Sequence, residues 1–424
     1  MIKQFGRQSD ETSEAPIITI LGLDNPADLT PSAQDLLRTA KVVAGPKRLL
    51  DIIQANLHLS AQTLPLVGNL NNWLEEIRLL LPENKIVILA DGDPNFFGLG
   101  AKVIKSFGQT KVTMLPAVTT VQKAFALMGV TWAGVEVVSL HGRTNYAPFF
   151  SAVFRASQIS GTGKLAVYTD NFNNPNLIAA MLIDRGQNNW KLTVFQDLGL
   201  ASQSVWSGSL AQASKEIFSP LNLTVLERTN LPEILTIGAP ESAYDHQAGL
   251  ITKSEVRTAA LGLLELKGHE TMWDLGCGSG SISLEAGLIL RHGQLYAVEK
   301  DPERAAQARL NRSRYGLAHL EIIEGQSLEV LPDLPRPDRV FIGGGGFQLE
   351  ALLQAVLGCL SPGGLVVAAV VKLDSLATVL SSLSATGQLL SVTQLNAARG
   401  ELLAGSLYLK PINPVFLIKG QANQ

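Results

Sequence analysis

Residues 273–280 read WDLGCGSG, and this stretch decides the fold of the second half of the chain. It follows a short apolar run and precedes residues 282–290, whose apolar side chains have helical spacing. The pattern predicts a strand, a tight glycine loop and the N-terminus of a helix. Glycines at every second position let a ligand lie against bare backbone, and the helix N-terminus adds free N–H groups. Together these features predict a nucleotide-type cofactor at the carboxyl end of the strand.

Two acidic residues indicate which cofactor binds. Asp274 stands at the end of the first strand, where an anion would repel a pyrophosphate but attract the ammonium group of a methionine moiety. Glu299 ends a second apolar strand about twenty residues on and suits a ribose diol. The dinucleotide fingerprint needs a third glycine where Ser281 stands, which disfavours an NAD enzyme. The pair of acids resembles the S-adenosylmethionine site of the class I Rossmann-like methyltransferases.

Composition sets the outer limits of the interpretation. A chain of 424 residues is too long for one hydrophobic core, so two domains are expected. The net charge of −3 argues against nucleic acid or an anionic membrane as a partner, and no run of eighteen apolar residues lacks Gly, Pro or charge. Cys277 and Cys359 lack metal-ligand spacing, which favours a reducing, cytoplasmic location and no metal site. Residues 1–15 carry no secretory signal and read as a disordered lead-in.

The first half alternates strands and helices, which predicts an α/β domain with one mostly parallel sheet. Thr30 and Pro31 read as the N-cap and first residue of a helix. Polar or glycine-containing loops follow three of the strands and place Asp91, Thr119 and His141 at strand ends. The expected strands are 17–21, 42–45, 85–90, 112–115, 135–140, 164–169, 190–198 and 221–226.

A weaker pattern from residue 229 to 248 predicts a linker, so the domains are expected at 16–228 and 249–424. Thr252 and Glu255 have the spacing of a capping box at the start of the next helix. Further strands are expected at 295–298, 320–323, 339–342 and 365–371, and the last strands read as an antiparallel hairpin at the sheet edge. His58, His246, His269, His292 and His319 lack ligand spacing and read as surface residues.

The first half resembles the tetrapyrrole methylase family, which uses S-adenosylmethionine on a different α/β fold. The matching segments are residues 88–100 (ILADGDPNFFGLG), 116–122 (PAVTTVQ) and 138–143 (VSLHGR). The last two are similar to the branch that acts on precorrin-6B. The first loop, residues 22–26 (GLDNP), carries one glycine where the family usually has more, and Thr119-Thr120 replaces a usual pair of serines.

The second half resembles the companion of that branch, a Rossmann-like methyltransferase that also decarboxylates. The matching segments are residues 252–257 (TKSEVR), the glycine loop with Glu285, residues 341–344 (FIGG) and 413–416 (NPVF). In order, the segments are similar to the fused, decarboxylating C5,15-methyltransferases of corrin biosynthesis. The resemblance implies methylation of precorrin-6B, or its cobalt form, at C5 and C15 with loss of the C12 acetate carboxyl. A tetrapyrrole substrate, cytoplasmic location and homo-oligomeric assembly are expected with it.

We therefore expect one S-adenosylmethionine site per domain. The residues assigned to the N-terminal cofactor site are Asp91, Gly92, Asp93, Phe97, Thr119 and Thr120. Those assigned to the C-terminal site are Thr252, Asp274, Gly276, Cys277, Gly278, Gly280, Glu299, Gly325 and Gly343. Because the substrate carries many carboxylates, His141, Arg143, Lys253 and Arg257 are assigned to catalysis and substrate binding, with Arg399 as a weaker candidate. The alternative is that only the C-terminal half is catalytic and that the N-terminal half serves as a binding or assembly domain.

Overall fold

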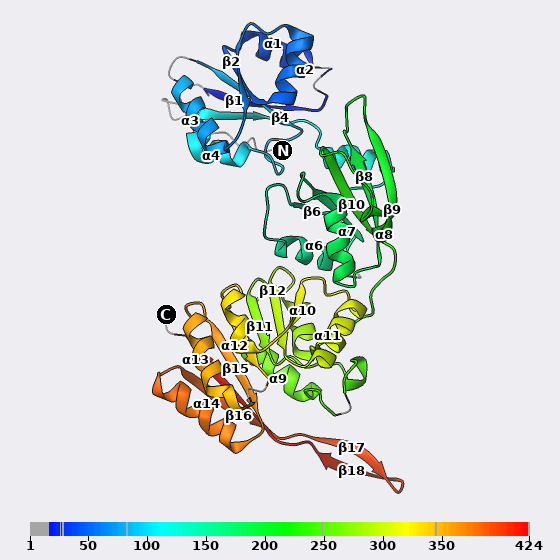
Figure 1. The fold of residues 1–424 in the computed structure, drawn as a ribbon, viewed down its shortest axis with the longest axis vertical. Coiled ribbons are helices and arrows are strands. Elements are labelled where there is room, and N and C mark those ends of the chain that lie inside the picture. The colour runs from blue at the N-terminus through cyan, green and yellow to red at the C-terminus, as the bar shows by residue number, and fades with distance from the viewer. Residues whose placement is uncertain are drawn as a thin grey trace, which may run out of the picture. The chain divides into compact units, whose positions relative to one another are not determined.

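The computed structural model describes residues 17–25, 27, 29–81, 84–158, 160–247, 249–343 and 346–422, and the expected lead-in, 1–15, lies outside them. The chain forms two compact units, coloured from blue to red along the sequence in Figure 1. The first contains the described residues up to Ala133 together with Phe195–Ser204, and the second contains Gly134–Val194 and the described residues from Val205 onward. In this described part no helix is both long and apolar enough to cross a membrane.

The first unit is built on a parallel five-stranded sheet in the order β3-β2-β4-β1-β5. Side chains alternate along β4, so that Ile86 and Ile88 pack with α3 and α4, whereas Val87 and Leu89 pack with α1 and α2. The predicted cap is confirmed, because Thr30 accepts a hydrogen bond from the Ala33 N–H (3.3 Å). The elements are β1 Ile18–Leu23, α1 Pro31–Thr39, β2 Val42–Pro46, α2 Lys47–Leu57, β3 Gln62–Leu66, α3 Leu70–Leu80, β4 Ile86–Asp91, α4 Gly100–Phe107, β5 Val112–Leu115 and α5 Thr120–Met128.

The expectation of a single sheet in the first half is wrong. After α5 the chain builds a second five-stranded sheet in the order β6-β7-β10-β8-β9, in which β6 runs parallel and β10 antiparallel to β7. Strand patterns locate strands but do not say which sheet each one joins, so the sequence did not reveal the division. The elements are β6 Glu136–Ser139, α6 Ala147–Ser157, β7 Lys164–Tyr168, α7 Pro175–Asp184, β8 Trp190–Gln196, β9 Ser204–Ser209, α8 Leu210–Ala213 and β10 Asn222–Arg228.

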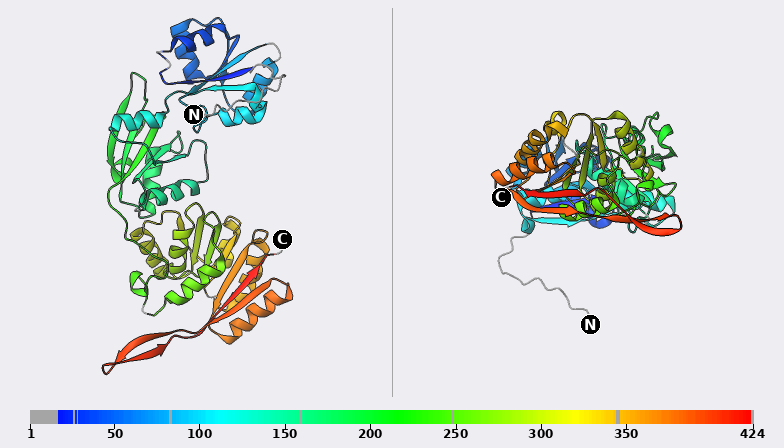
Figure 2. Two further views of the ribbon diagram at one scale, coloured as in Figure 1. Left: turned by 180° about the vertical axis from the view of Figure 1, so that it is seen from behind. Right: turned by 90° about the horizontal axis from the view of Figure 1, so that it is seen from below.

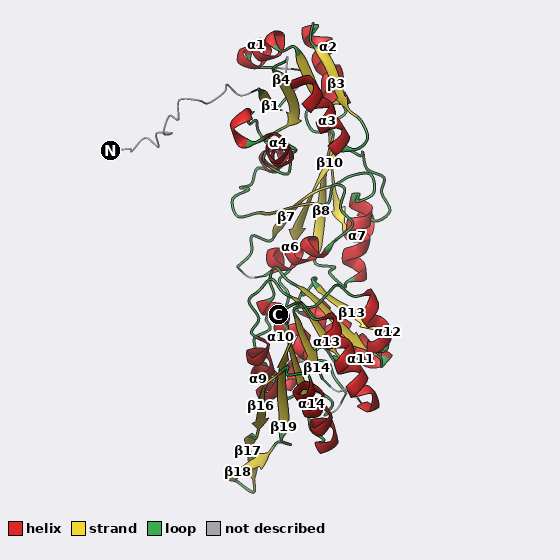
Figure 3. Cartoon of the chain, turned by 90° about the vertical axis from the view of Figure 1, so that its left-hand side faces the viewer, coloured by secondary structure: helices red, strands yellow, loops and turns green. Residues whose placement is uncertain are grey.

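The rest of the second unit is a Rossmann-like domain with a seven-stranded sheet in the order β13-β12-β11-β14-β15-β19-β16. The first five strands are parallel and β19 is antiparallel to both its neighbours. The helices cover the sheet, as Figure 3 shows in red against yellow strands. They are α9 Ser254–Leu264, α10 Ser281–Ile289, α11 Pro302–Arg314, α12 Ser327–Val330, α13 Leu349–Cys359 and α14 Leu373–Ala385; the strands are β11 Thr271–Leu275, β12 Gln294–Glu299, β13 Leu320–Glu324, β14 Arg339–Ile342, β15 Leu365–Val370, β16 Leu389–Leu395 and β19 Val415–Gln421.

The predicted hairpin at the sheet edge is only partly present. β16 and β19 do pair at that edge, but two further strands, β17 (Ala398–Leu403) and β18 (Ser406–Pro411), form a separate two-stranded sheet. This hairpin extends beyond the body of the Rossmann-like domain, as the left view of Figure 2 shows in red. The chain therefore leaves the sheet after β16 and returns to it only at β19.

The second sheet packs on the Rossmann-like domain through buried polar and apolar contacts. The Ser151 hydroxyl donates to the Gly293 carbonyl (3.1 Å), and the Arg185 guanidinium donates to the Ala318 carbonyl (3.1 Å). The ring of Phe154 lies 4.2 Å from that of His319, between centroids. The surface interpretation of His319 is therefore wrong: burial lowers the pKa of its imidazole to about 3.

Candidate cofactor sites

The glycine loop joins β11 to α10 at the point where the strand order reverses. β11 lies between β12 and β14, and in open parallel sheets such a position forms a crevice for ligands. The N–H groups of Gly276 and Cys277 both donate to the Val298 carbonyl, at 2.9 and 3.1 Å. A Cβ added at Gly278 would meet no atom within 4 Å, whereas one at Gly280 would lie 3.2 Å from the Ala308 Cβ. Gly278 thus faces open space, and Gly280 allows α11 to approach.

Asp274 lies buried beneath this loop at the N-terminus of α10. The Ser283 hydroxyl and backbone N–H both donate to its carboxylate, while Oδ1 has no hydrogen-bond partner among the described residues. Burial raises the pKa of Asp274 to about 7, although the bonds from Ser283 act in the opposite direction. The unpaired oxygen of this buried carboxyl group is an unsatisfied acceptor, and the ammonium group of a ligand is a donor of the kind that would satisfy it.

Glu299, the last residue of β12, binds the backbone of the glycine loop. Its carboxylate accepts the Gly278 N–H at 2.8 Å and the Asp301 N–H at 3.0 Å, and the side chain is only 3% exposed. The residue therefore fixes the loop and at the same time presents further acceptor positions beside Gly278. Both features suit a group that must hold a ribose diol in one orientation.

The other glycines assigned to this site lie at neighbouring strand ends. Gly325 follows β13 and donates its N–H to the Glu299 carbonyl (3.0 Å), and Gly343 follows β14 and donates to the Leu275 carbonyl (3.0 Å). A Cβ at Gly343 would stand 3.0 Å from the Gly276 carbonyl oxygen, so this strand end must remain without a side chain. Gly344 and Gly345, the next two residues of the chain, lie outside the described residues.

Cys277 has the character of a packing residue. Its thiol is buried, and burial raises its pKa well above the ordinary value, with the carboxylates of Asp274 and Glu299 acting in the same direction. A thiol in such surroundings stays protonated and is a poor nucleophile.

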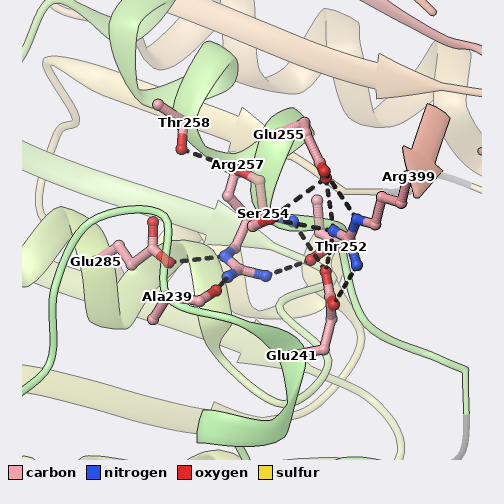
Figure 4. Close-up of polar contacts among 9 residues, drawn as sticks. All are labelled: Ala239, Glu241, Thr252, Ser254, Glu255, Arg257, Thr258, Glu285 and Arg399. Carbon is pink, nitrogen blue, oxygen red and sulfur yellow. Dashed lines mark hydrogen bonds and ion pairs between the residues drawn. The ribbon is translucent and has the colours of Figure 1, made fainter. Parts of the chain in front are cut away.

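Arg257 occupies the interior, at odds with a substrate-binding role. Its side chain is fully buried: Nε donates to Glu285 (2.8 Å), and the two terminal nitrogens donate to the carbonyls of Thr252 and Ala239 (Figure 4). Glu285 also accepts the Tyr244 hydroxyl (2.7 Å). All three guanidinium nitrogens of Arg257 thus donate to protein acceptors. The predicted role of Arg257 in binding a substrate carboxylate is therefore at odds with the structure.

This buried cluster fastens residues 238–247, termed the connecting segment, to the helix that follows the glycine loop. The Gly238 N–H donates to Glu285 at 3.0 Å, and Tyr244 lies 4.9 Å below the Arg257 guanidinium, measured to its ring centroid. Sequence reasoning noted Glu285 as part of a motif but missed its partnership with Tyr244 and Arg257. The available signal was a charged residue inside an otherwise apolar helical stretch, which calls for a buried partner of opposite charge.

The predicted capping box at Thr252 is wrong. α9 begins at Ser254, and Lys253 occupies the N-cap position with no side-chain cap. Glu255 instead binds Arg399 through two hydrogen bonds of 2.7 and 2.8 Å, and Arg399 also pairs with Glu241 (Figure 4). The Arg399 hydrogen bonds lower the pKa of both carboxyls to about 2. A long-range ion pair has therefore replaced the local cap.

Lys253 is half-buried, and its ammonium group has no hydrogen-bond or ion-pair partner among the described residues. Arg399, by contrast, is occupied by two carboxylates. Of the three cations proposed in the second domain, Lys253 alone, within the described part of the chain, keeps a charge available for a substrate carboxylate.

In the first unit, three strand ends meet closely at two glycines. A Cβ at Gly22 would lie 2.1 Å from the Gly92 carbonyl oxygen and 2.8 Å from the Ala117 nitrogen. Gly92 has a φ of +61°, and a Cβ there would lie 3.0 Å from the Thr119 Cα. The ends of β1, β4 and β5 therefore converge, as expected for loops that follow parallel strands.

The remaining residues assigned to this site lie at the end of β4, in the loop that follows it and at the start of α5. Asp91 pairs with Arg48 (2.7 Å) at a half-exposed position, and Asp93 accepts the Asn95 N–H (2.8 Å). Thr119 caps α5 in a capping box with Gln122, while Phe97 is 49% exposed and has a positive φ of 56°. The loop of Thr119 and Thr120 thus has a fixed conformation beside Gly92.

His141 and Arg143 belong to the second unit, in the exposed loop after β6. A ring nitrogen of His141 lies 3.3 Å from the Thr169 carbonyl oxygen, and the Gly142 N–H donates to Asp170 (2.6 Å). Burial would raise the pKa of Asp170, but hydrogen bonds from Gly142, Asn173 and Phe172 outweigh it and lower that pKa. The guanidinium of Arg143 has no partner among the described residues.

Comparison with known proteins yields two family models and several relatives along the whole chain. Residues 21–214 match the tetrapyrrole (corrin/porphyrin) methylases, and residues 242–420 match a precorrin methyltransferase domain. A precorrin-6Y C(5,15)-methyltransferase [decarboxylating] from Sinorhizobium is 30% identical over 421 residues, which cover 96% of this chain and 97% of that protein.

Shorter relatives match one domain. A probable cobalt-precorrin-6B C(15)-methyltransferase (decarboxylating) from Pyrobaculum aerophilum is 40% identical over 190 residues, or 44% of this chain and 97% of the relative. A crystal structure of a precorrin-6Y C5,15-methyltransferase from Geobacter metallireducens is 34% identical and covers 44% of this chain and 98% of its own, with a TM-score of 0.42.

Proposed function

Because the chain belongs to the decarboxylating precorrin-6Y C5,15-methyltransferases of cobalamin biosynthesis, we propose a division of labour between its halves. The domain from residue 249 methylates C15 and removes the C12 acetate carboxyl, and the domain of residues 16–228 methylates C5. Each domain binds one S-adenosylmethionine. The main support for a cofactor site is the glycine loop of the C-terminal domain. There the buried carboxyl group of Asp274, the exposed backbone of Gly278 and the carboxylate of Glu299 lie at the ends of neighbouring strands.

The residues of the C-terminal site suit this cofactor. Bound S-adenosylmethionine would supply an activated methyl group on a sulfonium. Asp274 Oδ1 would accept a hydrogen bond from the ammonium group, and Glu299 would accept from the ribose hydroxyls. Gly278 would let the cofactor lie against the backbone, since no atom occupies the position of its missing Cβ.

Positioning supplies most of the rate in this chemistry. The carbons to be methylated in a reduced tetrapyrrole are enamine-like and attack directly, so the protein must bring them in line with the methyl group. Lys253, whose ammonium group is free among the described residues, would orient a substrate carboxylate near the loop. Decarboxylation needs an electron sink, and the conjugated substrate ring serves as that sink.

The N-terminal site is assigned from the course of its backbone. Gly22, Gly92 and Thr119 form a compact backbone convergence at the ends of three parallel strands, which is where ligands gather in such sheets. His141 and Arg143, both exposed in the loop after β6, would bind the substrate. Two free cysteines are in keeping with a cytoplasmic location, and we also propose that the enzyme is a homo-oligomer.

Calorimetry and product mass together test the proposal. Titration with S-adenosylmethionine should show two sites per chain, and incubation with precorrin-6B should give a product with two added methyl groups and one carbon dioxide lost. Glu299→Ala should weaken the C-terminal site by about 1.5–3 kcal/mol, roughly 10- to 150-fold in affinity. At a cofactor concentration that saturates only the wild-type site, the product should therefore carry one added methyl group.

Glu324→Ala is the matched control, because Glu324 ends the neighbouring strand but is half-exposed and pairs with Arg309 (3.4 Å) at the surface. It should bind and react as the wild type does. A single cofactor site in the wild type would contradict the proposal and favour an N-terminal half that serves only for binding or assembly. Unchanged affinity in Glu299→Ala would remove Glu299 from the cofactor site.

A further inference from the structure

Asn311 is a polar side chain of α11 that makes none of the cofactor contacts proposed for Asp274 and Glu299. It is fully buried, and it follows Ala308 by about one helical turn, so both residues lie on the same face of the helix. A Cβ at Gly280 would lie 3.2 Å from the Ala308 Cβ, so this face packs against the glycine loop. A buried amide needs hydrogen-bond partners, and those of Asn311 indicate its role.

The amide of Asn311 joins two backbone segments. Its Oδ1 accepts the Asp245 N–H at 2.8 Å, and its Nδ2 donates to the carbonyls of Asp245 and Ser279, both at 3.0 Å. An amide group has one acceptor oxygen and two N–H donors, so these three bonds use the oxygen and both donors. Since Asp245 belongs to the connecting segment and Ser279 to the glycine loop, one buried side chain holds the two together.

The Ser279 carbonyl lies in the part of the loop where the backbone has the most freedom. Ser279 stands between Gly278 and Gly280, whose φ angles are +57° and +79°, and glycine adopts other conformations as readily. Glu299 holds this part of the loop through the Gly278 N–H, and Asn311 holds it through the Ser279 carbonyl. The two side chains therefore select one conformation from the several that the glycines allow.

The connecting segment is also bound to α10, the helix that directly follows the loop. The Gly238 N–H and the Tyr244 hydroxyl both donate to the buried Glu285 of that helix, at 3.0 and 2.7 Å. The segment is therefore held both to the loop, through Asn311, and to the helix after it, through Glu285. A change in the order of the loop thus reaches the segment through buried hydrogen bonds.

We propose that Asn311 is a positioning residue of the C-terminal cofactor site, which holds the glycine loop in its cofactor-binding conformation and couples the loop to the connecting segment. This inference rests on the proposed function of the loop as a cofactor site. Asn311 acts through the Ser279 carbonyl and touches neither cofactor nor substrate. It should therefore change the affinity for the cofactor and leave the rate of methyl transfer at saturation unchanged.

The test compares Asn311→Ala with two controls in the full-length chain. Titration calorimetry with S-adenosylmethionine should show an affinity about 3- to 10-fold lower at the C-terminal site, which is identified as the site that Glu299→Ala weakens. The cofactor KM should rise by the same factor, with kcat unchanged.

Each control removes a nearby interaction and leaves the bonds of Asn311 in place. Ser313→Ala removes the hydrogen bond from the same helix to the Gly186 carbonyl (2.6 Å). Asp245→Ala removes the ion pair with Arg314 (2.5 Å) but keeps the backbone groups that bind Asn311. Both controls should bind the cofactor as the wild type does.

Hydrogen exchange gives a second readout, which the wild type supplies even if Asn311→Ala does not fold. Saturating cofactor should slow backbone exchange in residues 238–244 of the wild type and of Asp245→Ala, but not of Asn311→Ala, a difference that lost stability alone does not produce. The proposal is overturned by unchanged affinity in folded Asn311→Ala, by an equal loss in Ser313→Ala, or by wild-type exchange that the cofactor does not alter. If Glu299→Ala weakens no site, the proposed function fails, and this inference fails with it.

Discussion

The two loop regions assigned to cofactor binding differ in how they are built. In the Rossmann-like domain, Asp274, Gly278 and Glu299 belong to adjacent strands of one sheet, and both carboxylates are at most 3% exposed. In the first unit, Gly22 and Gly92 meet in one sheet, but His141 and Arg143 belong to the other compact unit. The first site is thus built on two buried carboxylates, whereas the second is built on a close approach of backbone segments.

The ion pairs near the two loop regions differ in how far they are exposed to solvent. Arg257 and Glu285 are both fully buried and attach the connecting segment to α10, whereas Arg48 and Asp91 are 33% and 49% exposed. Burial makes the first pair part of the domain's interior, and solvent screens the second. The comparison teaches that the Arg257–Glu285 pair is structural, whereas the Arg48–Asp91 pair remains near water.

The largest expected effect is in the first unit. Gly92→Val should abolish methylation at C5, because a side chain at φ +61° is strained and its Cβ would press on the Thr119 Cα at 3.0 Å. The product, weighed by mass spectrometry, should still gain one methyl group and lose carbon dioxide. Gly129→Val is the control, since Gly129 has a similar φ of +67° but open space around it. Double methylation by Gly92→Val would break the assignment of this loop.

The second prediction compares the ion pairs directly. Arg257→Ala should lower the free energy of unfolding of the Rossmann-like domain by about 3–5 kcal/mol, because it leaves Glu285 buried without its cation. Arg48→Ala removes an exposed pair and should cost about 0–1 kcal/mol. Urea denaturation of both variants measures the difference. Similar losses in the two would show that burial does not distinguish these regions.

The third prediction concerns the pH dependence of stability. The pKa of Asp274 is raised from 3.8 to about 7, so between these values the folded protein holds a proton that the unfolded chain has released. Its stabilising contribution is therefore fully present below about pH 3.8 and is lost as the pH rises to about 7. Asp274→Asn should remove this decline, which amounts to at most about 1.4 kcal/mol per pH unit.

Urea denaturation at intervals between pH 4 and pH 7 checks this prediction. The wild type should lose stability relative to Asp274→Asn as the pH rises. Parallel curves for the two proteins would mean that Asp274 ionises normally beneath the loop.

Errors of prediction are concentrated where distant residues meet. The strands around the glycine loop were predicted nearly to the residue, because apolar periodicity and glycine spacing are local properties. The capping box at Thr252 failed because Glu255 binds Arg399, 144 positions along the chain. His319 was placed at the surface because nothing nearby in the sequence indicates that Phe154 covers it. Division into two sheets was missed for the same reason.

By itself the sequence determined the α/β class, the loop of Gly276 to Gly280 and the two acids beside it, since strand alternation and backbone freedom are fixed by each residue and its near neighbours. Tertiary structure alone decided that Arg257 is an interior anchor and that the hairpin of β17 and β18 leaves its leucines exposed to water. It also decided that Lys253 has no ion-pair partner among the residues that the structure describes. Whether a charged or apolar side chain meets a partner depends on burial, and burial is produced by segments that are far apart in the chain.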